Sequence, residues 1–193
     1  MAILRAGTQE ISSESRTLPR GDALVPVFHA RPDGMPVAGV VLHPDIMGIR
    51  PLFETMAERL ASHGFAVAVV EPFPRKSEAE RAGSDVATRM GWVSGLDDDE
   101  QLDDLSAAAD LLVIADDVTS VGVLGFCMGG MYALEAAATD RFDRAVAFYG
   151  MIRLPEAWKS PGRRPALDTA ADVCPTLAIF GSLDAMTVPF SSR

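Results

Sequence analysis

The sequence is short of cysteine, histidine and basic residues, and each shortage excludes a class of protein. Two cysteines in 193 residues, Cys127 and Cys174, do not make the disulfide framework of a small secreted protein. Seventeen Lys and Arg against 27 Asp and Glu give a net charge of −10, which argues against binding to nucleic acid or to anionic membranes. The three histidines belong to no cluster with metal-ligand spacing, so we expect no metal site.

Long hydrophobic runs are missing as well. No apolar stretch approaches the length of a membrane span, and the opening MAILRAGTQE has too short an apolar run for a signal peptide. Hydrophobic residues nevertheless make up 48% of the chain, enough to bury a substantial core. We therefore expect one domain over residues 1–193, with 1–19 as a flexible or edge segment. We also expect a soluble, cytoplasmic protein whose partner is a small molecule.

What the sequence does contain is an alternation of short apolar runs with helical patterns. This alternation predicts an α/β fold, a mostly parallel sheet with helices on both faces. The turn at Arg20-Gly21-Asp22 predicts an antiparallel hairpin at the start of the sheet. Two helices are expected over residues 51–63 and within residues 95–117. The predicted strands cover residues 23–29, 38–43, 65–70, 121–125, 144–149 and 175–180.

In the stretch VGVLGFCMGGMYALEAAA, residues 121–138, a cysteine stands where an apolar strand passes into an Ala-rich helix. A strand, a tight turn and a helix make a nucleophile elbow, whose tip has an unfavourable backbone conformation. Residues two before and two after the tip must be small, and Gly125 and Gly129 meet that need. The helix N-terminus favours the thiolate of Cys127, which should react faster than Cys174. The alternative, a buried structural cysteine, is disfavoured by the flanking glycines.

A second stretch, HPDIMGIRP at residues 43–51, follows an apolar strand and precedes a helix. Its backbone N–H groups can therefore face the elbow and complete an oxyanion hole. Together with GFCMGG and FGSLDAMTVP, it resembles the dienelactone hydrolase family of α/β-hydrolases, from about residue 20 to the end of the chain. The resemblance implies an α/β-hydrolase fold and the hydrolysis of a small ester or lactone with no metal or organic cofactor.

The resemblance also assigns roles to particular residues. Cys127 corresponds to the nucleophile of the family, and Asp184 corresponds to the acid of its catalytic triad. The backbone N–H groups of Met128 and Ile46 correspond to the oxyanion donors. Asp45 stands where the family usually has a glutamate that interacts with the resting thiol, and its side chain is one methylene shorter.

The histidine of the triad has no counterpart in this sequence. An α/β-hydrolase triad runs nucleophile, acid, histidine along the chain, whereas all three histidines precede Cys127. In the family the histidine lies some tens of residues beyond the acid, so we expect a C-terminally incomplete fold. Residues 175–180 would then be an exposed sheet edge through which the chain self-associates. His43 could replace the missing histidine, although a histidine at a strand end is more often structural.

Three functions remain open from the sequence. The first is a dienelactone hydrolase-like enzyme with a Cys nucleophile. The second is a catalytically impaired or inactive remnant that binds a ligand or partner through the same pocket, and a histidine able to reach Cys127 would discriminate between the two. The third, a thiol trap or redox protein, is disfavoured because no resolving cysteine is evident near the elbow. Arg81 and Arg89 fall where the family has a substrate-binding arginine, but a solvated helix face is favoured for both.

Overall fold

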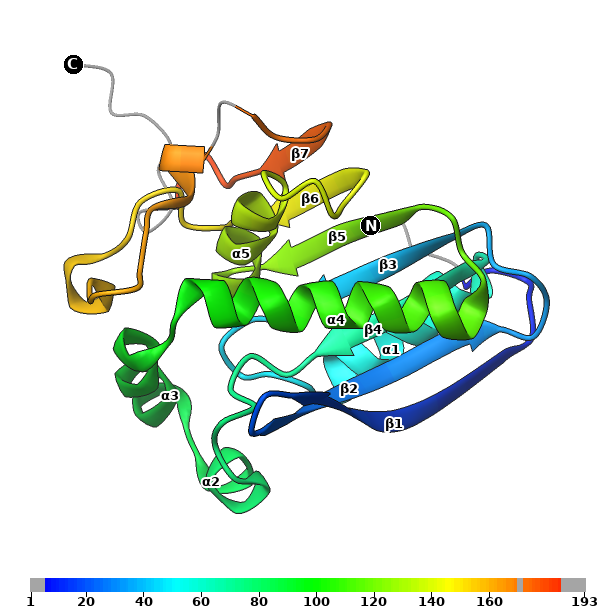
Figure 1. Ribbon diagram of the computed structural model, residues 1–193, viewed down its shortest axis with the longest axis horizontal. Helices are drawn as coiled ribbons and strands as arrows, with labels where there is room; N and C mark the ends of the chain where they lie inside the picture. Colours follow the sequence, from blue (N-terminus) through cyan, green and yellow to red (C-terminus); the bar gives the residue numbers. More distant parts are fainter. Residues whose placement is uncertain (1–5, 170–171, 185–193) are drawn as a thin grey trace.

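The computed structural model describes residues 6–169 and 172–184, and its centre is a seven-stranded sheet in the order β1-β2-β4-β3-β5-β6-β7 (Figure 1). The strands from β4 to β7 in this order run parallel, while β2 is antiparallel to both β1 and β4. The expected α/β fold with a mixed, mostly parallel sheet is therefore confirmed. The strands span Ile11–Arg20 (β1), Ala23–Pro32 (β2), Ala38–His43 (β3), Phe65–Val70 (β4), Val121–Phe126 (β5), Arg144–Phe148 (β6) and Thr176–Ile179 (β7).

The N-terminal hairpin is longer than the sequence suggests. Strands β1 and β2 pair along their whole length, from Ile11 opposite Pro32 to Arg20 opposite Ala23. The turn between them is made by Gly21, whose φ of 54° suits a residue without a side chain. The hairpin places β1 at one edge of the described sheet, and β7 lies at the other edge.

Three long helices cover the two faces of the sheet, as Figure 1 shows. Helices α4 (Asp98–Asp116) and α5 (Met128–Ala136) lie on one face, and α1 (Pro51–Ser62) lies on the other. The N-terminus of α4 is capped by Asp97, whose carboxylate accepts two backbone N–H bonds. Acidic residues in its first turn add a favourable interaction with the helix dipole, which explains the acidic run in this part of the sequence.

Two apolar cores result, one on each face of the sheet. Their buried side chains contact helices α4 and α5 on one side and helix α1 on the other. Alternation along the strands divides neighbouring residues between the cores, so that Val41 and Val123 belong to the first and Leu42 and Val69 to the second. Burying apolar side chains on both faces is typical of a parallel sheet.

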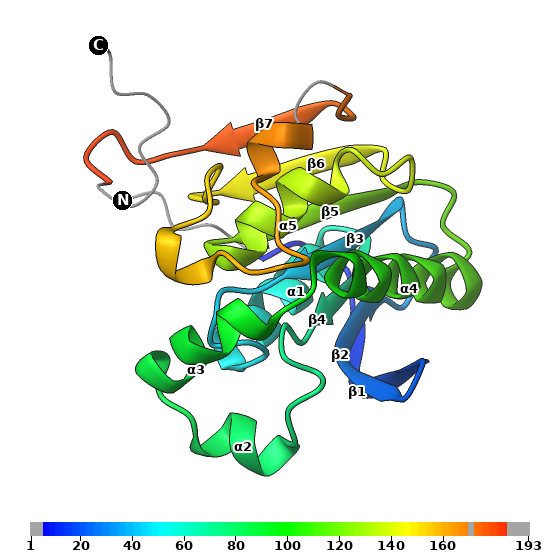
Figure 2. The ribbon, with the colours of Figure 1, turned by 60° about the vertical axis from the view of Figure 1, so that its left-hand side comes forward.

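Two short helices that the sequence did not predict lie between β4 and α4. They are α2 (Glu78–Gly83) and α3 (Val86–Trp92), and Figure 2 shows them projecting from the end of the molecule at which the parallel strands finish. Each begins at a side-chain cap, a capping box at Ser77 and an Asp85 carboxylate that accepts the Thr88 N–H. No helix of the described residues is long and apolar enough to cross a membrane.

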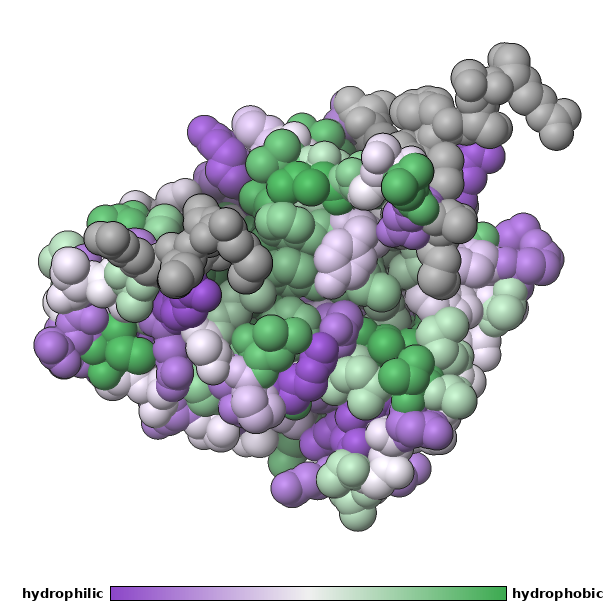
Figure 3. Space-filling model, turned by 180° about the vertical axis from the view of Figure 1, so that it is seen from behind, coloured by the Kyte–Doolittle hydropathy of each residue, from purple (hydrophilic) through white to green (hydrophobic). Residues whose placement is uncertain are grey.

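Helix α1 covers only part of its face of the sheet, and the rest of that face is exposed. Seen from behind, an apolar hollow occupies the upper part of this face (Figure 3). The register of the sheet places side chains of β5, β6 and β7 in one row here, and Leu177 and Ile179 of β7 are 56% and 40% exposed. The Phe126 and Phe148 rings stack within this row, with their centroids 4.9 Å apart.

Candidate active site

Cys127 lies at the tip of the turn between β5 and α5. Its φ of 57° and ψ of −118° fall in a region that residues with side chains rarely adopt, as a nucleophile elbow requires. Its N–H donates to the Phe148 carbonyl at 3.0 Å, and its carbonyl accepts from the Met131 N–H at 3.1 Å. The strained residue is therefore anchored to the end of β6 and to the first turn of α5.

The glycines around Cys127 are required by close backbone contacts. A Cβ atom at Gly125 would lie 1.9 Å from the Gly129 carbonyl oxygen, and one at Gly129 would lie 2.2 Å from the His43 carbonyl oxygen. Neither distance is possible for real atoms. Gly125 thus lets the strand approach the helix, and Gly129 lets the helix approach the end of β3. The small residues predicted at these two positions are needed for the reason inferred from the sequence.

Residues 44–50, which we call the oxyanion loop, connect β3 to α1 and pass the N-terminus of α5. Its Pro44 carbonyl would lie 2.4 Å from a Cβ atom at Gly129. Ile46 is 8% exposed and Met128 is fully buried, and both belong to the core against which Cys127 packs. The structure therefore brings the two segments that carry the proposed oxyanion donors to one place.

Two carboxylates act on the thiol of Cys127. Burial raises the pKa of this thiol above its ordinary value, a hydrogen bond from the Met128 N–H lowers it, and the charges of Asp45 and Asp184 raise it. The net direction is upward. The lowering expected at a helix N-terminus is present in the Met128 hydrogen bond, but burial raises the pKa more. Asp184 follows β7, and its charge reaches the thiol across the ends of the parallel strands.

Asp45 is held by a neighbour that the sequence did not single out. Arg50 donates to both of its carboxylate oxygens, at 2.6 and 2.7 Å, and the Met47 N–H donates to one of them at 2.9 Å. The bidentate ion pair fixes the Asp45 side chain within the oxyanion loop. The described hydrogen bonds of the Asp45 carboxylate come from Met47 and Arg50 within the loop, and the effect of this carboxylate on Cys127 is electrostatic.

The three histidines are engaged elsewhere in the described structure. His43 is 1% exposed, and its two ring nitrogens face the Pro44 carbonyl at 3.1 Å and the Gln101 side-chain oxygen at 3.2 Å. Burial lowers its pKa. His29 is buried against Asp116 at 2.8 Å, and His63 caps the C-terminus of α1, away from the carboxyl ends of the parallel strands. The described contacts of His43 thus support the structural role favoured for it.

Near the site, Tyr149 was not singled out from the sequence, and Arg89 was expected on a solvated helix face. Tyr149 directly follows β6 with a φ of 42°, and the proximity of Cys127 and Asp45 helps burial to raise its pKa. Arg89 is 5% exposed, so the solvated helix face expected for it is wrong. Its guanidinium lies 5.8 Å from the centroids of both the Phe73 and Trp92 rings, and these contacts explain the difference. The only sequence signals for these two residues were that Tyr149 is a polar residue after a strand and that Arg89 is a second arginine near an acid that is buried in the structure.

A cavity of about 790 Å³ lies beside the β1–β2 turn, α2 and α4, and Cys127 is not among its lining residues. Two of its arginines are paired, Arg20 with Asp103 and Arg75 with Glu100 and Asp104. Among residues 6–169 and 172–184, no group of His, Cys, Asp and Glu side chains is arranged to hold a metal ion.

The sheet order, the strained Cys127 turn and the facing loop define an α/β-hydrolase fold, and comparison with solved structures agrees. The crystal structure of a Klebsiella pneumoniae protein named as a dienelactone hydrolase superposes with a TM-score of 0.82 at 27% identity, over 92% of this chain and 75% of that one.

The chain belongs to the dienelactone hydrolase family, whose sequence model matches residues 25–192. Carboxymethylenebutenolidase from Rhodococcus opacus is 31% identical over 90% of this chain. A Bradyrhizobium protein named "Probable 2-oxo-3-(5-oxofuran-2-ylidene)propanoate lactonase" is 33% identical over 75% of this chain. The aligned residues span 67% and 58% of the length of these two relatives.

Proposed function

We propose that the protein is a hydrolase of small esters or lactones that uses Cys127 as its nucleophile. The observation that carries the proposal is the conformation of Cys127, a strained residue at a strand-to-helix turn with the oxyanion loop packed against the same helix. The family's relatives support the substrate class, because two of them are named as a butenolidase and a lactonase. Both cysteines are free thiols, which suits a reducing, cytoplasmic location.

The proposed reaction has two steps. The Cys127 sulfur forms a bond to the carbonyl carbon, and the carbonyl π electrons move to oxygen, where the N–H groups of Met128 and Ile46 would stabilise the charge. The carbonyl then reforms as the bond to the leaving oxygen breaks and the thiol proton passes to that oxygen, giving a thioester and an alcohol or, for a lactone, a tethered hydroxyl group. Water next attacks the thioester carbon, the C–S bond breaks, the carboxylic acid is released, and one proton of the water passes to the sulfur, which restores the thiol.

Asp184 would orient a histidine in this scheme, as the acid of a triad does. In the described structure the His43 and His29 rings have other partners, and His63 lies at the C-terminus of α1. General acid–base help is worth about 10²- to 10⁴-fold in rate. We therefore expect the chain to be acylated and then to release its acyl group slowly.

An assay with p-nitrophenyl acetate tests this proposal. Wild type should release a burst of p-nitrophenol that stalls, and mass spectrometry should find the acetyl group on Cys127. Cys127→Ala should abolish the burst, whereas the matched variant Cys174→Ala should keep it. His43→Ala should leave the burst intact. Binding of esters without acylation of Cys127 would overturn the proposal and would instead favour a ligand-binding protein.

A further inference from the structure

Glu71 and Arg89 form a buried ion pair. The family resemblance gives Glu71 no role, and it relates Arg89 only to the region of a substrate-binding arginine. Glu71 directly follows β4 and Arg89 lies on α3, and each is 5% exposed. Their nearest charged atoms are 3.6 Å apart, longer than a good charge-assisted hydrogen bond. A buried ion pair is weak evidence for stability, because desolvation of the two charges offsets their attraction. Its presence here calls for another explanation.

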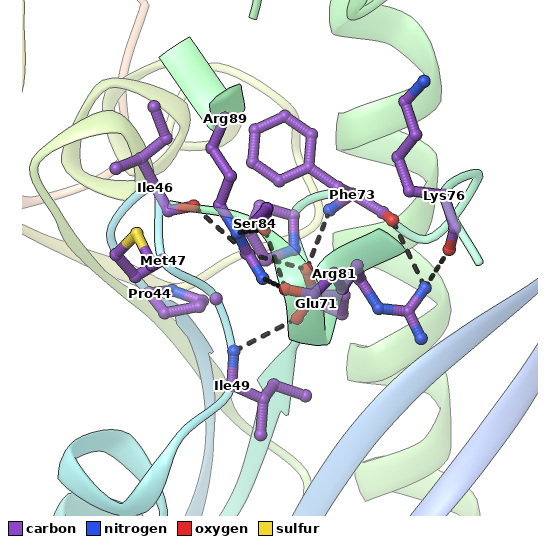
Figure 4. Close-up of polar contacts among 12 residues, drawn as sticks. Pro44, Ile46, Met47, Ile49, Glu71, Phe73, Lys76, Arg81, Ser84 and Arg89 are labelled. Atoms are coloured by element: carbon purple, nitrogen blue, oxygen red, sulfur yellow. Dashed lines mark hydrogen bonds and ion pairs between the residues drawn. The ribbon is translucent and has the colours of Figure 1, made fainter. Parts of the chain in front are cut away.

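The polar atoms of this pair are directed at backbone groups. Arg89 Nη1 donates to the Ile46 carbonyl at 3.2 Å, and Glu71 Oε2 accepts from the Ile49 N–H at 3.1 Å. Figure 4 shows both contacts converging on the oxyanion loop from the side of α3. The Ile46 carbonyl and the Ile46 N–H flank the same Cα atom. Holding that carbonyl therefore restricts where the N–H can point.

The pair is itself held rigidly. Arg89 Nε donates to the Ser84 hydroxyl at 2.8 Å and Nη2 donates to the Arg81 carbonyl at 2.9 Å, so its guanidinium is fixed along three directions (Figure 4). Glu71 accepts a second backbone N–H, from Phe73, at 3.3 Å. These contacts connect the helices α2 and α3 to the oxyanion loop, whose own ion pair, Asp45 with Arg50, lies within the loop.

Gly48 shows how closely the pair packs against the loop. Its φ is +71°, and a Cβ atom there would lie 2.4 Å from Glu71 Oε2 and 2.9 Å from Arg89 Nη1. The loop therefore has no room to shift toward the pair. We propose that Glu71 and Arg89 are positioning residues that hold the oxyanion loop so that the Ile46 N–H faces the reacting carbonyl oxygen at Cys127. This inference rests on the proposed function, because it needs the attack of Cys127 to form an oxyanion on the substrate.

The test compares two reactions of the same thiol. Acylation of Cys127 by p-nitrophenyl acetate passes through an oxyanion, whereas alkylation by iodoacetamide displaces iodide and forms none. In Arg89→Lys the charge beside Glu71 remains, but one ammonium group cannot reach Ile46, Ser84 and Arg81 together. We expect acylation to slow by about 10- to 100-fold and alkylation to change by less than about threefold, since a displaced oxyanion donor affects only the first reaction.

A matched control and a second variant complete the test. Arg75 also pairs with two carboxylates, of Glu100 and Asp104, but has no described contact with the oxyanion loop, so Arg75→Lys should leave both rates unchanged. If Arg89→Lys does not fold, the same two rates are measured for Glu71→Gln, and we expect its acylation to be slowed as well. Unchanged acylation, or a parallel fall of both rates, would overturn the positioning role while leaving the proposed function intact. Wild type that is alkylated but never acylated at Cys127 would overturn both.

Discussion

The reactivity of Cys127 is set by an opposition between its burial and its place at a helix N-terminus. The Met128 N–H stabilises the thiolate, as helix N-termini do, but burial and two nearby carboxylates favour the neutral thiol. The net result is a raised pKa, so the resting thiol is protonated at neutral pH. In this form it is protected from oxidation, because oxidants react with the thiolate.

Removing the charge of Asp45 should therefore activate the thiol. Asp45→Asn deletes a negative charge that raises the pKa of Cys127, so this pKa should fall. Because alkylation follows the thiolate fraction, its rate falls as the pH drops through the thiol pKa. We expect the midpoint of the pH–rate profile with iodoacetamide to move to lower pH in the variant, with several-fold faster labelling at pH 8.

Asp110 offers the control for this experiment. It also pairs with an arginine, Arg141 at 2.7 Å, but it is not among the charges that act on Cys127. Asp110→Asn makes the same change in net charge, and its profile should match wild type. An unshifted profile for Asp45→Asn would show that Asp45 does not govern the resting thiol.

At the scale of elements, hydrophobic patterns predicted the parallel strands and α1 well, because these elements bury runs of apolar side chains. The short helices α2 and α3 were missed, since they bury little and depend on caps at Ser77 and Asp85. The oxyanion loop and the elbow could be located from glycine spacing and family resemblance. The burial of Arg89 could not, because it depends on Glu71 and Phe73, which lie on another segment of the chain.

The junction of β5 and α5 gives a direct test of the glycine requirement. In Gly125→Ala the new Cβ would lie 1.9 Å from the Gly129 carbonyl oxygen, so strand and helix must separate. We expect a loss of about 3 kcal/mol in the free energy of unfolding, the upper end of the range typical of forced overpacking in a core.

Gly122 lies on the same strand and serves as the control. A Cβ there would be 3.4 Å from the Arg144 carbonyl oxygen, an ordinary contact, so Gly122→Ala should change stability by less than about 1 kcal/mol. Urea denaturation followed by circular dichroism measures both variants. Equal stability of the two would show that the elbow has room to relax.

For the molecule as a whole, the candidate site depends on parallel strands that end on one side. The oxyanion loop follows β3, Cys127 follows β5, Tyr149 follows β6 and Asp184 comes after β7. Residues far apart in sequence therefore meet at the carboxyl ends of the parallel strands. Ligands bind at the carboxyl ends of the strands in open α/β sheets for this reason. The two edges of the sheet formed by the described residues differ in character.

We expect the β7 edge to pair with a second copy of the chain. The β1 edge carries Glu14, Arg16 and Pro19, residues that discourage edge pairing, whereas β7 has the uncharged sequence TLAI and all of its residues are exposed. Sedimentation velocity should show a concentration-dependent species of twice the 20.6 kDa monomer mass. Leu177→Lys should shift it toward monomer because a charge would then enter the apolar row, while Leu24→Lys, which changes a leucine 62% exposed on β2, should not. A wild type that stays monomeric at all concentrations would show that this edge is protected and is not an interface.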